Sequence, residues 1–167
     1  MTELPNKPNV RKALIISAGI ISLAIACAAA MPARSGTAKL PVLEIADAAS
    51  GKKYGRWTLR EPYFSIEFTH SVNQSPVREK FKAEGKMIRP CEVRFASFGA
   101  GMQSDLEPGQ TMTRDGGTMV ITGNYAPHPE LNCIIGTVSD HLLIIGEESI
   151  SLRELCGQNA RVSIRIQ

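Results

Sequence analysis

The chain has 167 residues, of which 43% are hydrophobic and 21% charged, values typical of one folded domain with room for a targeting segment. The formal net charge is +3. The first 33 residues hold three of the 19 basic residues and one of the 16 acidic ones. The remainder is therefore close to neutral, and its charge indicates no nucleic-acid partner.

The N-terminal segment predicts export. Lys7, Arg11 and Lys12 precede a charge-free apolar run of 19 residues, 13–31, which Pro32 ends. A run of about 20 apolar residues can cross a bilayer, and positive charge before it keeps the N-terminus in the cytoplasm. We therefore expect a single hydrophobic helix with its C-terminal side exported.

We divide the chain into a targeting segment at 1–33, a short tether at 34–39 and an extracytoplasmic β domain at 40–167. Three fates of the targeting segment remain open. It is an uncleaved signal anchor, a signal peptide cleaved at small residues such as Ala28-Ala29-Ala30, or a lipidation signal at Cys27, where "AIAC" is similar to a lipobox.

The β domain contains short strand patterns separated by turns, and only 151–157 is compatible with a helical turn. Eight to ten short strands predict an all-β fold, either an antiparallel β-sandwich or a partly closed barrel, preceded by the N-terminal hydrophobic helix. The expected strands are 40–47, 54–60, 63–72, 77–84, 91–98, 117–122, 132–138, 141–146, 149–152 and 161–166.

A hairpin near the middle of the chain carries the first candidate site. A loop at 73–76 would place Phe68 opposite Phe81 and His70 opposite Glu79. Side chains facing each other across two strands lie about 4.5–5.5 Å apart at Cβ, so we expect an imidazole–carboxylate hydrogen bond.

Three roles for the His70–Glu79 pair remain open: a structural pair that sets the hairpin register, a grip for a polar ligand or partner, and general acid–base catalysis. Ser71 is expected on the opposite face of the strand from His70. That orientation argues against a Ser–His nucleophile and hence against a hydrolase.

A glycine-rich loop is the second candidate. Gly99 and Gly101 permit close backbone approach, so successive N–H groups could cradle an anion, although a β-bulge or tight corner explains them as well. Met102 is expected at the core or at the rim of the site.

The cysteines and histidines predict no metal site and no cofactor. Cys133 and Cys156 are candidates for a disulfide in an oxidising compartment, and buried thiols are the alternative. No CxxC or Cys/His spacing suits zinc, and His128 and His141 lack a second ligand at a useful distance along the chain.

Basic residues recur on one strand, where Arg78, Lys80 and Lys82 share the outward phase. Such a face could touch anionic lipid headgroups or an acidic partner. A solvated strand face that resists edge pairing explains it equally well.

Three stretches carry a resemblance to a known family: "FSIEFTHSVNQSPVREKF" at 64–81, "FASFGAGM" at 95–102 and the final strands from His141. They resemble a bacterial family of small exported proteins of unknown function, whose genes often lie beside TAXI-type TRAP (tripartite ATP-independent periplasmic) transporters. The resemblance implies an envelope location and an accessory role beside a transporter, and it brings no established reaction. Asn73 stands where an acidic residue is expected.

These observations lead to an ordered set of hypotheses. The first is a non-enzymatic accessory or recognition subunit of a TRAP/TAXI-type solute transport system in the bacterial inner membrane, with its domain in the periplasm and a permease or solute receptor as partner. The second is a periplasmic domain that binds or senses a small solute. A hydrolytic enzyme is third.

Overall fold

The computed structural model describes residues 39–72, 74–96, 105–123 and 125–167, which form eleven β-strands and one short helix. The elements are β1 (Val42–Asp47), β2 (Lys53–Thr58), β3 (Tyr63–Thr69), β4 (Pro76–Glu84), β5 (Met87–Phe95), β6 (Gln110–Asp115), β7 (Thr118–Gly123), β8 (Leu131–Ile134), β9 (His141–Ile145), β10 (Glu148–Ser151), α1 (Leu152–Cys156) and β11 (Arg161–Ile166).

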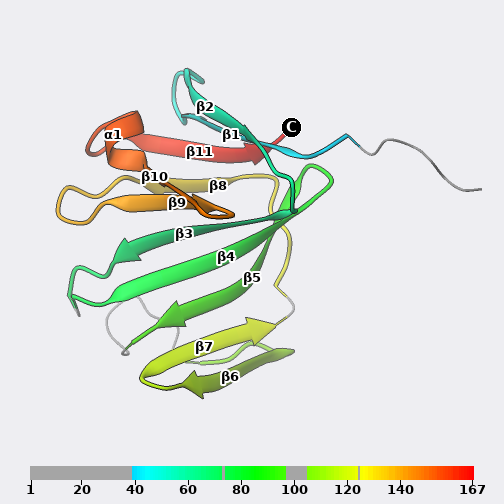
Figure 1. Ribbon diagram of the computed structural model, residues 1–167, viewed down its shortest axis with the longest axis vertical. Helices are drawn as coiled ribbons and strands as arrows, with labels where there is room; N and C mark the ends of the chain where they lie inside the picture. The colour runs from blue at the N-terminus through cyan, green and yellow to red at the C-terminus, as the bar shows by residue number, and fades with distance from the viewer. Residues whose placement is uncertain (1–38, 73, 97–104, 124) are drawn as a thin grey trace, which may run out of the picture. The chain divides into compact units, whose positions relative to one another are not determined.

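The strands form two antiparallel sheets (Figure 1). The small sheet has four strands in the order β2-β1-β11-β8, and the large sheet has seven in the order β10-β9-β3-β4-β5-β7-β6. Each sheet keeps two edge strands within the described part of the chain, so neither closes into a barrel. The predicted all-β antiparallel fold is confirmed, and a sandwich describes it better than a barrel.

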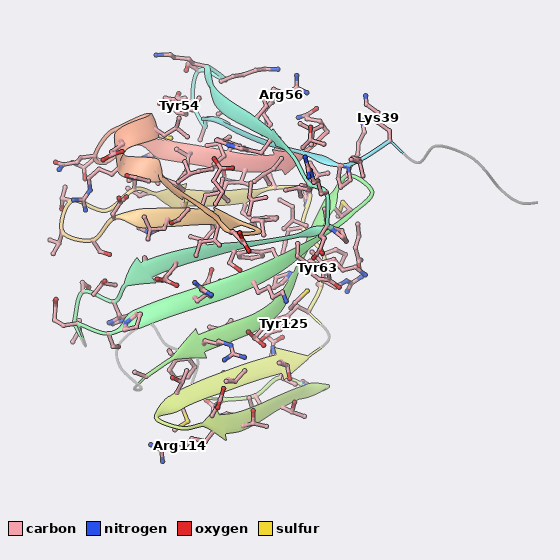
Figure 2. The ribbon with its side chains drawn as sticks, viewed as in Figure 1. Lys39, Tyr54, Arg56, Tyr63, Arg114 and Tyr125 are labelled. Carbon is pink, nitrogen blue, oxygen red and sulfur yellow. The ribbon has the colours of Figure 1, made fainter. Side chains whose placement is uncertain are left out.

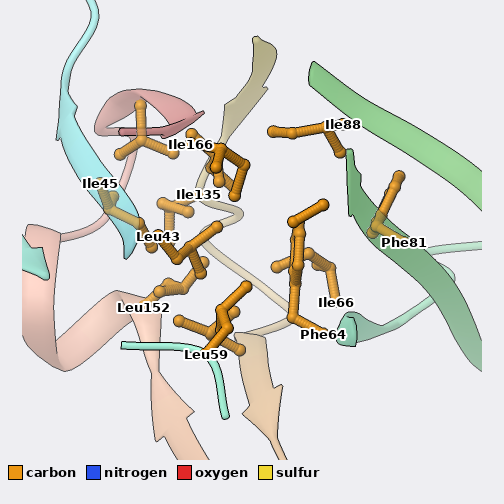
Figure 3. Packing of buried hydrophobic residues seen from close by; sticks show 14 residues of the cluster. Leu43, Ile45, Leu59, Phe64, Ile66, Phe81, Ile88, Ile135, Leu152 and Ile166 are labelled. Atoms are coloured by element: carbon orange, nitrogen blue, oxygen red, sulfur yellow. The ribbon is translucent and has the colours of Figure 1, made fainter. Parts of the chain in front are cut away.

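One hydrophobic core lies between the two sheets (Figure 3). Leu43 and Ile45 alternate along β1 and are fully buried, while Phe64 and Phe81 of the large sheet stack with ring centroids 5.2 Å apart. Fully burying a side chain of this size contributes about 1.5–3 kcal/mol, so this cluster fixes the packing of the sheets. We call it the covered region; its buried members are Leu43, Ile45, Leu59, Phe64, Ile66, Phe81, Ala83, Ile88, Ile135, Leu143, Leu152, Val162, Ile164 and Ile166.

A second, smaller cluster lies farther along the large sheet, where Val77, Phe95 and Ile121 are buried. The described hydrophobic side chains that pack against it come from the large sheet itself or from the loop after β7, and none of them comes from the small sheet. We call this cluster the open region; its half-buried members are Phe68, Val93, Met112, Met119 and Tyr125, the last of which is labelled in Figure 2.

Strand β6 was absent from the sequence prediction, although the turn at 114–117 that follows it was expected. Within β6 the threonines at 111 and 113 alternate with Met112, which pairs with Ile121 of β7. A single half-buried methionine on the inner face is a weak periodic signal, so the strand was missed. Strand β5 begins at Met87, before the expected start at residue 91. The sequence suggested the later start because Pro90, which lies inside the strand beside a register shift, is unusual within a strand.

The expected N-terminal helix lies outside the described residues. Within the part of the chain that the structure describes, no helix is both long enough and apolar enough to cross a bilayer.

Candidate functional site

A cleft of about 550 Å³ opens on the inner face of the large sheet, at the end where β3 runs into β4. Its floor comes from β3, β4 and β5, and its rim comes from the β3–β4 loop and the segment that joins β8 to β9. The residues that line it are Phe68, Thr69, His70, Ser71, Val77, Glu79, Val93, Phe95, Gly136, Thr137, Val138, Ser139 and His141.

Glu79 occupies an unusual position in the floor of the cleft. Cross-strand pairing places Ile66 on one side of it and Val93 on the other. The same row across the sheet continues through Leu143, beyond Ile66, and through Ile121, beyond Val93. An ionisable carboxyl group therefore interrupts a row of apolar side chains on the core-facing side of the sheet.

The surroundings of Glu79 disfavour its charged form. Burial raises the pKa of the carboxyl group above its ordinary value. Within the described residues, no hydrogen bond or ion pair of this carboxyl group offsets the loss of water. A carboxyl group that is half-buried in a cleft and lacks a compensating partner is a candidate functional residue.

The predicted pairing of His70 with Glu79 is wrong, because the hairpin has a different register. Glu79 pairs with Ile66, and Phe81 pairs with Phe64 in place of Phe68. This register keeps the stacked phenylalanines in the covered region. The shift is an even number of residues, so the predicted inward and outward faces of both strands are correct.

His70 lies in the loop that follows β3, where its backbone N–H donates to the Ser75 carbonyl at 2.8 Å. Its Nδ1 accepts from the Val72 N–H at 3.3 Å. Val72 was expected to pair in the hairpin but is 66% exposed. Ser71 also lies in this loop, and both His70 and Ser71 line the cleft together with Glu79. Three of the predicted candidates therefore line one cleft, whereas the predicted contact between His70 and Glu79 is absent.

His141 is a site residue that the sequence analysis missed. It pairs with Phe68 across β9 and β3, and the two rings stack with centroids 5.1 Å apart. Burial lowers the pKa of His141, Asp140 opposes that change and Arg153 adds to it. The alternation of the strand at 141–146 indicated an inner face, but the partner lies more than 70 positions away in the sequence.

The rim segment at 136–140 is fixed by hydrogen bonds to both of its neighbours. Asp140 accepts from the Ser151 hydroxyl at 2.6 Å and from the Arg153 N–H at 3.1 Å. The Ser139 hydroxyl accepts from the Thr69 N–H at 2.7 Å. A Cβ on Gly136 would lie 2.8 Å from the Ser139 carbonyl oxygen, so this tight corner requires glycine. These hydrogen bonds hold the rim in place between α1 and the end of β3.

The other predicted site residues fall in two groups. Cys27, Gly99, Gly101 and Met102 lie outside the described residues. Cys133 and Cys156 are free thiols in the structure, and their disulfide stays a prediction.

Cys133 and Cys156 share an apolar environment. Burial raises the pKa of each thiol to about 11, and Glu79 adds to the rise at Cys133. Cys133 contributes further to the rise at Cys156, which indicates that the two thiols lie near each other. Both half-buried side chains pack against the covered region.

Arg78, Lys80 and Lys82 lie on the outer face of β4, as predicted, and most of their charges are paired. Arg78 binds Glu67 at 2.7 Å, and Lys82 binds Glu84 at 3.2 Å. Lys80 lies over the Tyr63 ring at 4.9 Å. Internal pairing of this kind favours the solvated-face interpretation over an unsatisfied surface for lipid.

Among the described residues, no group of three or more His, Cys, Asp or Glu side chains is close enough to hold a metal ion. Two histidines and Glu79 line the same cleft but do not form such a group.

Comparison with known families gives one result. A family model described as Domain of unknown function (DUF1850) matches residues 64–152, just over half of the chain. The match runs from β3 through β10 and includes every residue that lines the cleft. Searches of the curated proteins and of the solved structures find no match to this chain.

Proposed function

We propose that this chain, which belongs to the DUF1850 family of domains of unknown function, is a non-catalytic envelope protein whose β domain binds a small polar solute in the cleft. The observation that carries the proposal is the cleft itself. Its volume of about 550 Å³ falls within the range of about 300–1,000 Å³ typical of sites for small molecules. The mostly apolar floor and the polar side chains of the rim also provide the two kinds of contact that such sites use.

The polar groups support binding over catalysis. The Ser139 hydroxyl donates to the Asp140 carbonyl oxygen at 3.1 Å instead of to a histidine. The Nδ1 of His141 accepts from the Gly136 N–H at 3.4 Å. Acyl-transfer catalysis needs a nucleophile hydrogen-bonded to its base, and these two rim residues are engaged elsewhere.

An accessory role beside a TRAP/TAXI-type transporter is part of the proposal. Its support is the resemblance through Thr69-His70-Ser71-Val72, whose His70 and Ser71 line the cleft. In this role the domain is tethered to the inner membrane by the segment at 1–33 and holds a solute at the periplasmic face, next to a permease or its solute receptor.

Affinity purification of the tagged full-length chain from solubilised membranes tests this role. We expect mass spectrometry to identify a permease or solute receptor of an ion-driven transporter. Val138→Arg should reduce its recovery, because Val138 lines the cleft and is 79% exposed. Glu147→Arg, in the exposed turn after β9, is the matched control.

If no transport protein accompanies the wild-type chain, the accessory role is wrong and the domain acts as a free-standing binder. Intact-mass measurement of the protein recovered from the same membranes distinguishes a retained anchor, a cleaved signal peptide and a lipid on Cys27.

A further inference from the structure

The charged groups of the cleft have one sign. Among the described residues that line it, Glu79 is the only acidic one, and none is a lysine or an arginine. Basic residues close to the hairpin point to the opposite face of the sheet, where Arg78 pairs with Glu67. A ligand that enters this cleft therefore meets one carboxyl group and no permanent positive charge.

The rest of the floor complements a cation better than an anion. Phe68 lines the cleft as a half-buried ring on which His141 stacks, and Phe95 borders the cleft but is only 1% exposed. An accessible aromatic ring attracts an ammonium group through the negative charge density over its face. An anion would meet the Glu79 carboxylate, which repels it.

The rim supplies neutral hydrogen-bonding groups. Thr69, Ser71, Thr137 and Ser139 place hydroxyl-bearing side chains around the mouth of the cleft. They suit uncharged polar atoms on the remainder of a ligand. The volume of the cleft also exceeds what a bare inorganic cation needs, so the complement of Glu79 is an organic ion.

We infer that the cleft binds an organic cation, with an alkylammonium group seated on the Glu79 carboxylate and against the ring of Phe68. This inference deepens the proposed function, because it names the chemical class of the solute. It also accounts for a carboxyl group in an apolar row, since the bound ammonium group would supply the partner that the described residues do not.

Three probes of one size test the charge preference: n-butylamine, n-butanol and butyrate. Each is titrated into the isotopically labelled full-length chain at pH 7 and constant ionic strength, and backbone amide shifts are followed by NMR. We expect butylammonium to shift the amides of Glu79, Val93 and His141. Butanol and butyrate should bind at least about tenfold more weakly, as measured from the concentration at which these shifts are half complete. The reason is that a close charge pair shielded from water is worth about 1.5 kcal/mol or more.

Matched variants identify the carboxyl group responsible. Glu79→Gln keeps the shape of the side chain and should weaken butylammonium binding about tenfold. Glu147→Gln removes the same charge from an exposed turn and should leave binding within about twofold, because it lies outside the cleft.

Two results would overturn the inference. Butyrate or butanol binding as tightly as butylammonium at the same amides would refute the cation preference, while solute binding in the cleft would stand. Absence of any response of these amides to butylammonium, or its full retention in Glu79→Gln, would also refute the role of Glu79. The proposed transport role would then still be decided by the purification experiment.

Discussion

The covered and open regions use the same sheet for different purposes. In the covered region, fourteen buried hydrophobic residues from both sheets, α1 and the connecting loops pack together. In the open region only three residues are buried, and Glu79 lies in the row beside them. A sheet face that is covered becomes a core, whereas the same face beyond the cover becomes the floor of a cleft with an ionisable group in it.

The difference follows from strand number. The large sheet has seven strands and the small sheet has four, so the small sheet does not cover the whole face of the large one. Side chains in β5, β7 and β6 still alternate as strands do, but their inner faces are only half-buried at Val93, Met119 and Met112. The core and the cleft thereby lie in different parts of one continuous sheet.

The largest expected effect is the loss of a core side chain from the covered region. Phe64→Ala removes a ring that is 2% exposed and stacked on Phe81, and should lower the free energy of unfolding by about 3–5 kcal/mol. Met119→Ala, in the open region, should lower it by about 1 kcal/mol, because that side chain is only half-buried. Urea denaturation measures both; equal losses would contradict the division into two regions.

The second-largest effect on stability is expected from the rim of the cleft. Asp140→Ala leaves the Ser151 hydroxyl and the Arg153 N–H without their acceptor, and we expect a loss of about 1–2 kcal/mol in the free energy of unfolding. The exposed Ser149→Ala, in the neighbouring strand, is the control and should be close to neutral. Asp140→Ala should also shift the NMR signals of the Thr69 and Ser139 backbone amides. Unchanged signals would mean that α1 does not hold the rim.

The third prediction concerns Glu79 and pH. The pKa of Glu79 is raised in the folded state, so the native chain holds this proton more tightly than the unfolded chain. Stability from this group is complete below pH 4.5, its ordinary pKa, and is lost as pH rises through the folded pKa. Glu79→Gln should therefore raise the free energy of unfolding at pH 7 by about 1 kcal/mol and leave it unchanged at pH 4. Thermal unfolding at both pH values measures this; destabilisation at pH 7 would show that the carboxylate has a partner.

His141 has the opposite dependence on pH. Its pKa is lowered in the folded state, so its contribution is complete above pH 6.5, its ordinary pKa, and is lost as pH falls through the folded pKa. Glu79→Gln removes the loss of stability that accompanies deprotonation of Glu79 as pH rises. The free energy of unfolding should therefore rise more steeply between pH 4.5 and 6.5 in this variant than in the wild type. An unchanged slope would show that Glu79 does not contribute to the pH dependence, and a slope of zero in Glu79→Gln would show the same for His141.

The smallest effect is expected on the outer face of the same strand. Arg78→Ala breaks an ion pair with Glu67 in which the arginine side chain is 48% exposed. Pairs of this kind contribute about 0.2–1 kcal/mol, so the melting temperature should change little, and less still in high salt. A loss comparable to that of Phe64→Ala would mean that the outer face is covered too.

The sequence by itself determined the alternation of side chains, and with it the all-β class. It also identified His70, Ser71 and Glu79 as candidates, because period-two patterning depends only on neighbours along a strand. It did not determine the hairpin register, because two even-numbered registers satisfy the same inward and outward pattern.

The tertiary structure decided which part of the inner face is covered. That choice depends on β1 and β11, from opposite ends of the domain, pairing in the small sheet. It also placed His141 on Phe68 and joined the rim to β3 through Ser139 and Thr69, contacts between residues distant along the chain. Local propensity carries no information on such contacts, since their geometry exists only after the two sheets have packed.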